Sequence, residues 1–228
     1  MIHLTKDELT YEKKSLLLSG KHHNPTRKII RMTSIQPFEA TDFFSLNAVN
    51  LDTFTENFPV EFYLEYLILW PSLMFKSVEL TSPAPGSNGN EISGYMMGKT
   101  EGKGQDWHAH ITAVTISPRF RRISLASMLC DTLKTITDNP PHNVNFIDLF
   151  VKCNNQLAIC LYEKLGYSVF RRVVGYYNSH TDPIPTRATK PNDLKDAFDM
   201  RHGMERDHGK SIRADGRKHN CLPQDVRF

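Results

Sequence analysis

The sequence predicts a single α/β domain in which helices cover both faces of a mixed, mainly antiparallel sheet. The first observation is the order of its segments, because apolar, β-branched runs and amphipathic helical stretches follow one another as β-α-α-β-β-β-α-β-α-β. The second is composition: 39% of the residues are hydrophobic and 23% are charged, as in ordinary globular proteins. The third is the length of 228 residues, which allows one good-sized core with tails.

The first half of the chain carries three expected strands and two expected helices. Thr41 and Asp42 are suited to cap the first helix, and Pro71 ends the second. The stretch 81–90 is rich in Pro, Gly, Ser and Asn, which indicates an exposed hairpin loop. We expect strands at 33–38, 74–80 and 92–100 and helices at 41–50 and 60–70.

The second half continues with four expected strands and two expected helices. A glycine-containing turn at 101–104 leads into a long strand, and Gly166 stands where a C-cap glycine ends a helix. Three prolines between 181 and 193 indicate a surface loop. We expect strands at 107–116, 146–151, 167–170 and 197–200 and helices at 124–137 and 156–165.

A basic turn joins the strand at 107–116 to the helix that opens at Ser124. Residues 119–122 read Arg-Phe-Arg-Arg. The first N–H groups of a helix point outward and its dipole favours negative charge, so such a turn can cradle an anion. The small side chains of Ser124 and Ala126 allow a phosphate to approach the backbone closely. A plain solvated corner is the alternative, and the turn alone does not decide between them.

Two motifs together resemble the GNAT superfamily of acetyl-CoA-dependent N-acetyltransferases. Residues 121–126 match the loop R/Q-x-x-G-x-G/A that cradles the CoA pyrophosphate, and residues 155–167 match Asn-x-x-Ala-x-x-x-Tyr-x-x-x-Gly-Tyr. Ser124 replaces the first glycine of the loop, and we expect this serine to avoid positive φ while its hydroxyl donates to phosphate. The cofactor-binding residues that the resemblance implies are Val114, Ile116, Arg121, Arg122, Ser124, Leu125, Ala126 and Asn155.

Further segments are similar to the NatB catalytic subunits within that superfamily, which acetylate protein N-termini. These segments are 50–58, 62–66, 107–113, 148–151, the pair Tyr176-Tyr177 and 197–201. The resemblance implies acetyl-CoA as cosubstrate and nascent chains beginning Met-Asp, Met-Glu, Met-Asn or Met-Gln as acceptors. It also implies a large helical-repeat auxiliary subunit as partner and work near the ribosome.

The resemblance extends from Met32 to the C-terminus, which divides the chain into three parts. Residues 1–31 are expected to be a disordered extension or the result of a start placed too far upstream, rather than a targeting segment. The acetyltransferase domain is expected at 32–200. The tail 201–228 alternates basic and acidic residues and is expected on the surface or on a partner.

Charge, cysteine content and hydropathy indicate a cytoplasmic protein. A net charge of +3 is too small to indicate nucleic-acid binding. No apolar run is long enough to span a membrane, and no secretory signal is recognisable. The cysteines show no CxxC spacing and are expected to be reduced thiols. They are Cys130, Cys153, Cys160 and Cys221.

Tyr162 is the expected general acid for the departing thiolate. An α-amine with a pKa near 8 is already partly neutral, so acetyl transfer needs only a modest base but does need a proton donor. Tyr162 follows Asn155 by about two helical turns, so both side chains can face the cofactor. Asn155 can also cap its helix. The resemblance implies backbone N–H groups around Val114 to Ile116 as donors to the thioester oxygen. An ordinary core tyrosine is the alternative for Tyr162.

His108 and His110 share one face of a strand because the side-chain period of a strand is two. No third ligand is spaced near them, so we predict no metal site. The resemblance places His110 at the peptide site, where its ring hydrogen-bonds the side chain of the second residue, with Thr112 beside it. A role for His110 as the base for the amine stays open, and His108 is expected to be structural.

The remaining expected site residues come from the resemblance alone. It places the carboxylate of Glu56 beside the substrate amine, where it anchors the ammonium or accepts a proton through water. Phe58, with the aromatic residues at 62–63, would form the pocket for the initiator methionine. Tyr176 and Tyr177 would bond the substrate backbone. Since neighbouring strand residues face opposite ways, only one of the two is expected to be central, and Tyr177 is preferred.

Two other functions remain open from the sequence. One is a GNAT enzyme that acts on another amine, such as lysine or a different N-terminus. The other is a non-catalytic CoA-binding scaffold subunit, for which Ser124 is the best support. The joint presence of Glu56, His110 and Tyr162 argues against the scaffold.

Overall fold

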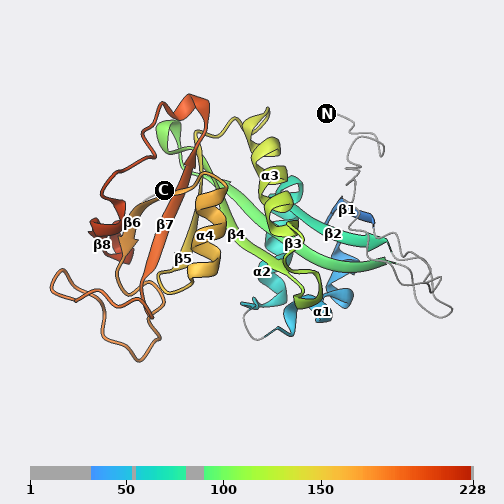
Figure 1. Ribbon diagram of the computed structural model, residues 1–228, viewed down its shortest axis with the longest axis horizontal. Helices are drawn as coiled ribbons and strands as arrows, with labels where there is room; N and C mark the ends of the chain where they lie inside the picture. Colours follow the sequence, from blue (N-terminus) through green and yellow to red (C-terminus); the bar gives the residue numbers. More distant parts are fainter. Residues whose placement is uncertain (1–31, 53–54, 81–89, 227–228) are drawn as a thin grey trace, which may run out of the picture. The chain divides into compact units, whose positions relative to one another are not determined.

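The computed structural model describes residues 32–52, 55–80 and 90–226 (Figure 1). Its strands form an 8-stranded sheet in the order β1-β2-β3-β4-β5-β7-β6-β8. β1/β2, β5/β7 and β6/β7 are antiparallel, whereas β4/β5 and β6/β8 are parallel. The predicted mixed sheet is confirmed. The extension 1–31 and most of the expected hairpin loop at 81–90 lie outside the described residues.

The predicted order of strands and helices is confirmed, with shifts of a few residues at their ends. The strands are β1 Met32–Pro37, β2 Met74–Leu80, β3 Asn90–Glu101, β4 His108–Ile116, β5 Phe146–Lys152, β6 Ser168–Val173, β7 Ala197–Gly203 and β8 Asn220–Cys221. The α-helices are α1 Asn47–Asn50, α2 Val60–Leu69, α3 Leu125–Asp138 and α4 Gln156–Lys164.

The helix expected at 41–50 is the main correction among the helices. A 3-10 helix covers Ala40–Ser45, and only Asn47–Asn50 are α-helical. Asp42 explains the tight first turn, because its carboxylate accepts from the Glu39 N–H at 2.7 Å and pairs with Lys76 of β2 at 2.5 Å. Tertiary pairing with the sheet therefore outweighs the propensity for one continuous helix.

The chain divides into two compact units, which are described separately. The first comprises the described residues up to Met96 together with Val114–Leu129, and it therefore contains β1, β2, α1 and α2. Its core includes Leu73, Met74, Tyr95 and Met96, which are all 0% exposed. The residue at 94 must be glycine, because a Cβ there would lie 2.6 Å from the Thr115 carbonyl oxygen.

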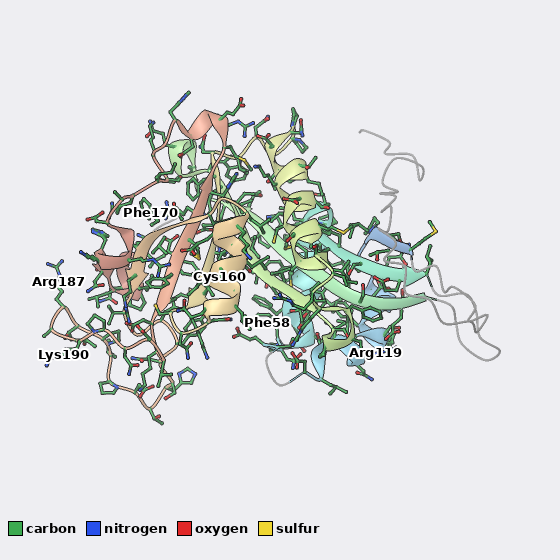
Figure 2. All side chains as sticks on the ribbon, viewed as in Figure 1. Phe58, Arg119, Cys160, Phe170, Arg187 and Lys190 are labelled. Atoms are coloured by element: carbon green, nitrogen blue, oxygen red, sulfur yellow. The ribbon has the colours of Figure 1, made fainter. Side chains whose placement is uncertain are left out.

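The second unit comprises Met97–Ala113 and Cys130–Phe228, and β5 is its central strand. Figure 1 shows β5, β7 and β6 side by side in the order that the pairings give. Ile147 is 0% and Leu149 2% exposed, and the intervening Asp148 is 0% exposed. The strand is thus buried on both faces, which explains its near-continuous apolar sequence. Figure 2 shows Arg187 and Lys190 pointing away from the strands on the expected exposed loop before β7.

The residues after Arg201 are folded onto the second unit. β7 continues to Gly203, and β8 pairs with β6 over Arg172↔Asn220 and Val173↔Cys221. The guanidinium of Arg206 donates to the Val144 carbonyl beyond the end of α3. Main-chain pairing and ion pairs therefore hold residues 202–226 on the second unit, where most of them are exposed. No helix among the described residues is long and apolar enough to cross a membrane.

Candidate functional site

The basic turn before α3 has an unusual backbone in the first unit. Arg122 and Ser124 both have φ of 68°, in the left-handed region. The expectation that Ser124 avoids positive φ is therefore wrong. The loop must reverse direction before α3 begins at Leu125, and this geometry holds the serine in a conformation that glycine adopts without cost. Since Ser124 is exposed and the first N–H groups of α3 have no carbonyl partner within the helix, the cradle shape is retained.

The arginines of the turn differ in their surroundings. Arg121 donates from Nε to the Ile116 carbonyl at 3.0 Å and forms an ion pair with Asp52. Arg119 pairs with Glu91 at 2.9 Å. Arg121 and Arg122 are exposed and add positive charge near the start of α3, which suits a pyrophosphate.

The other residues of the first unit that are expected to bind the cofactor could do so through backbone groups rather than side chains. Leu125 is 3% exposed and Ile116 8% exposed, so their side chains belong to the core. Val114 and Ala126 are half-buried. The side chain of Leu125 is therefore not available to a phosphate, and only its backbone N–H could serve the expected role.

The aromatic residues expected to bind the initiator methionine form a cluster in the first unit. Phe58 stacks on Phe62 with 4.8 Å between ring centroids and contacts Tyr63 edge-on at 5.8 Å. The Phe58 N–H donates to the Tyr63 hydroxyl at 3.4 Å, and the Tyr95 hydroxyl donates to Asn50 Oδ1 at 3.1 Å. Such rings offer the large apolar surface that a methionine side chain needs. Glu56 is exposed in the chain just before this cluster.

In the second unit, the ring of His110 contacts the buried carboxylate of Asp148. Its Nδ1 lies 2.8 Å from Asp148 Oδ1, since the parallel register places His110 opposite Asp148. The Asp148 side chain is 0% exposed and that of His110 13% exposed. Thr112 is half-buried two residues further along β4 and shares the face of His110.

Tyr162 lies on α4 and Asn155 is the N-cap of this helix, as the motif predicts. The Asn155 side chain accepts from the Ala158 N–H at 3.2 Å, so the capping prediction is confirmed. Tyr162 is 7% exposed, and its ring lies 5.6 Å from that of Tyr167. Burial raises the pKa of Tyr162, and the neighbouring Cys130 adds to this effect. The phenol therefore keeps its proton at neutral pH, as a general acid must.

The two adjacent tyrosines do not lie on a strand. β6 ends at Val173, and Tyr176 and Tyr177 follow in a turn. The premise that one of them must face away is therefore wrong, because the alternation of a strand does not apply in a turn. The Tyr176 ring stacks on Phe150 at 4.7 Å and contacts the Tyr177 ring at 5.0 Å. Phe150 in turn lies 5.6 Å from the His110 ring.

Two residues of this group carried no assigned role in the sequence. Asp148 is a charged residue inside an apolar strand, and that contrast was the signal that could have identified it. Phe150 had no comparable signal, because an aromatic residue in a buried strand is usually core. No group of three His, Cys, Asp or Glu side chains that could hold a metal occurs among the described residues.

The strain at Ser124 yields a prediction about stability. Ser124→Gly should raise the free energy of unfolding by about 0.5–1 kcal/mol, because glycine relieves the left-handed strain at a smaller entropic cost. Urea unfolding of the two proteins measures the difference. Ser127→Gly, the same change three residues later inside α3, should lower the free energy of unfolding. Equal effects of both substitutions would contradict the role of φ.

The comparisons with known proteins agree with these features. The model of the acetyltransferase (GNAT) family matches residues 45–167. The N-terminal acetyltransferase B complex catalytic subunit NAT3 of Saccharomyces cerevisiae is 67% identical over 198 residues, which cover 86% of this chain and 100% of that protein. The naa20 subunit of Schizosaccharomyces pombe is 44% identical over 86% of this chain and 100% of that protein.

Solved structures also show similarity to chains of NatB acetyltransferases. A chain of the NatB acetyltransferase complex bound to a bisubstrate inhibitor superimposes with a TM-score of 0.72 at 51% identity, covering 86% of this chain and 99% of that one. Naa20 of Chaetomium thermophilum in complex with a bisubstrate analogue superimposes with a TM-score of 0.69 at 36% identity, covering 85% and 99%. The chain therefore belongs to the acetyl-CoA-dependent GNAT acetyltransferases, within the family of catalytic subunits of the N-terminal acetyltransferase B complex.

Proposed function

We propose that this enzyme transfers the acetyl group of acetyl-CoA to the α-amine of nascent chains that begin Met-Asp, Met-Glu, Met-Asn or Met-Gln. The observation that carries this specificity is the pair formed by His110 and the buried Asp148 at 2.8 Å. A histidine held in one orientation can select a second residue that offers a side-chain oxygen. The identity to relatives named as NatB catalytic subunits supports the same substrates.

The chemistry follows from the residues at hand. A part of the substrate amine is neutral at physiological pH and attacks the thioester carbonyl. Backbone N–H groups around Val114 to Ile116 stabilise the oxygen as it becomes negative. Tyr162, whose phenol is protonated at neutral pH, protonates the CoA thiolate as it leaves, and the proton that the amine nitrogen loses on forming the amide passes to solvent or back to the Tyr162 phenolate. Glu56 anchors the ammonium before it loses its proton.

The turn before α3 holds the cosubstrate. Exposed guanidinium groups at Arg121 and Arg122 and the first N–H groups of α3 would bind its pyrophosphate. Asn155 at the start of α4 contacts it as well. Because Ser124 adopts a left-handed φ that glycine adopts without cost, its presence gives little support to a scaffold without activity.

A peptide-library assay tests this function. The full-length chain, co-expressed with its partner subunit, is supplied with acetyl-CoA and peptides that differ in their first two residues. Acetylation should be fastest on Met-Asp, Met-Glu, Met-Asn and Met-Gln peptides. Equal rates on lysine side chains or on unrelated N-termini would favour a GNAT enzyme for another amine, and CoA binding without turnover would favour a scaffold.

His110→Ala tests which residue reads the second position. The substitution should lower kcat/KM on a Met-Asp peptide by roughly 2- to 13-fold, which corresponds to one hydrogen bond of 0.5–1.5 kcal/mol, with a much smaller change on Met-Leu. His219→Ala, at an exposed histidine of the same unit, is the control and should change neither value. An equal loss on both peptides would assign His110 to the amine or to the fold instead.

We propose that a large helical-repeat auxiliary subunit binds the exposed apolar face of α2 and that the pair works in the cytoplasm near the ribosome. Leu64 is 37%, Ile68 75% and Leu69 55% exposed, and the three line one shallow groove on this helix. Apolar side chains clustered on one surface are typical of an interface. The structures named as the NatB complex support a multi-subunit enzyme.

A charged side chain on the exposed apolar face of α2 should weaken binding of the auxiliary subunit. Ile68→Asp is expected to lower the amount of auxiliary subunit that co-purifies with the chain, because it places a carboxylate in the interface. Leu157→Asp on α4 is the matched control, since Leu157 is 82% exposed and lies in the other unit. Undiminished co-purification of Ile68→Asp would exclude this part of α2 from the interface.

A further inference from the structure

A buried series of carboxylates and imidazoles lies behind His110 in the second unit. Asp148 Oδ1 is 2.8 Å from His110 Nδ1 and 3.6 Å from His108 Nε2. Glu101 Oε1 of β3 lies 3.7 Å from the same His108 nitrogen. The side chains of His108 and Asp148 are 0% exposed. Water therefore does not screen these groups from one another.

The contacts of His108 determine its charge. Its Nδ1 lies 2.6 Å from the Asp106 carbonyl oxygen, which can only accept, so this nitrogen carries a hydrogen. Its Nε2 faces the carboxylates of Glu101 and Asp148. The interaction of Nε2 with these carboxylates is favourable only if Nε2 carries a hydrogen too. Burial lowers the pKa of His108, but the nearby carboxylates of Glu101 and Asp148 outweigh burial and raise it overall.

Glu101 is the partner anion of His108. Burial raises the pKa of Glu101, but the nearby His108 ring and the hydrogen bond from Lys99 lower it to about 2. The Asp148 carboxylate lies between the two imidazoles, with Oδ1 2.8 Å from His110 Nδ1 and 3.6 Å from His108 Nε2. An ionised carboxylate is an acceptor only, so the Nδ1 of His110 must carry the hydrogen of the bond to Asp148.

This bond restricts what His110 can offer to a substrate. Because Nδ1 bonds Asp148, any hydrogen bond from the ring to a substrate side chain must be made by Nε2. In the neutral ring, Nε2 then only accepts. A substrate carboxylate also only accepts, so it can be bound only by the imidazolium form, in which both nitrogens donate. An Asn or Gln side chain has an NH₂ group and can donate to the neutral ring.

We propose that Asp148 is a positioning residue that fixes the tautomer of His110, so that the enzyme recognises an acidic second residue only with a protonated His110 and an amide second residue with the neutral ring as well. The inference rests on the proposed substrate specificity and deepens it. It makes Asp148 part of the specificity mechanism although its side chain is fully buried.

The pH dependence follows by linkage. Binding of a Met-Asp peptide requires the second proton of His110, so kcat/KM for Met-Asp relative to Met-Asn should fall as pH rises and the ring loses that proton. The α-amine titrates alike in both peptides and cancels in the ratio. The charged and titratable groups around His110 also act on both peptides. They are Lys99, Glu101, His108, Asp148, Tyr176, Tyr177 and, opposite Asp148 on β7, Arg201.

The first measurement uses the full-length enzyme in complex with its partner subunit. The ratio of kcat/KM for Met-Asp and Met-Asn peptides is measured from pH 6 to pH 9, and it should fall by up to about tenfold per pH unit once His110 is deprotonated. Long-range ¹H–¹⁵N spectra of labelled histidines should show the hydrogen of neutral His110 on Nδ1. A ratio independent of pH, or a hydrogen on Nε2, overturns the proposal.

Asp148→Asn gives the second measurement. Its amide can donate to Nδ1, which permits the neutral tautomer with a hydrogen on Nε2, so the ratio should vary by less than about twofold over the same pH range. Asp207→Asn is the control, because Asp207 is also buried but bonds Ser211, and it should keep the wild-type profile. A wild-type profile in Asp148→Asn overturns the proposal. If no variant prefers any of these peptides over Met-Leu, the proposed function itself fails, which is a distinct outcome.

Discussion

Tyr162→Phe is expected to lower kcat by about 10²- to 10⁴-fold while acetyl-CoA still binds, because the hydroxyl acts only when the thiolate leaves. The ring of Tyr162 is 7% exposed and packs against Tyr167, so phenylalanine should keep the core filled. Burial raises the pKa of Tyr162, and the phenol is therefore protonated throughout the neutral range. Loss of the hydroxyl removes the proton donor and little else.

The measurement is turnover of a Met-Asp peptide at saturating substrates, together with a separate titration of acetyl-CoA. Tyr167→Phe is the matched control, since Tyr167 is 6% exposed and burial raises its pKa as well. This control should retain turnover. Wild-type turnover in Tyr162→Phe would make Tyr162 a packing residue and would require another acid. Tyr177 would then be the first candidate, because it also influences the pKa of Tyr162.

Sequence patterns predicted the fold well where local rules dominate. β2 has the predicted bounds, and α4 ends at Lys164, two residues before Gly166, which has the φ of 86° expected of a glycine that ends a helix. Long-range contacts decided the rest. β8 is two residues long, and its pairing with β6 leaves no periodic pattern in the sequence. The 3-10 helix at 40–45 depends on an ion pair between Asp42 and Lys76, which are distant in the chain.

The candidate site shows the same division. The motif correctly predicted the cap at Asn155, because capping depends on neighbouring residues. The conformation of Ser124 could not be predicted, since the loop as a whole imposes it on a residue that disfavours it. The arrangement of Tyr176 and Tyr177 was predicted wrongly because it depended on where β6 ends. The contact of Asp148 with His110 could not be predicted from the sequence, because it depends on the register that places the two residues opposite each other.

Asp199→Ala is expected to lower the free energy of unfolding by about 3–5 kcal/mol, because it leaves two interior guanidinium groups without their anion. The carboxylate of Asp199 is 0% exposed and accepts from Arg171 Nε at 2.8 Å and from Arg201 Nη2 at 3.0 Å. The Arg201 guanidinium also lies over the ring of Phe170, which Figure 2 labels, at 3.8 Å from its centroid. The ring offers weaker attraction than a carboxylate and cannot replace it.

Urea unfolding of the purified full-length protein measures this loss, and circular dichroism before unfolding shows whether the variant is folded. Glu163→Ala is the control: its carboxylate pairs with Arg217 at 2.6 Å, but the two side chains are 46% and 51% exposed. Because water screens an exposed pair, this substitution should change the free energy of unfolding by no more than about 1 kcal/mol. Similar losses of unfolding free energy in the two variants would mean that the buried ion pairs of Asp199 with Arg171 and Arg201 stabilise the protein no more than an exposed pair does. A large loss in Asp199→Ala alone would establish that these paired charges hold β6 to β7, the strands that precede and follow the loop beginning at Tyr176 and Tyr177.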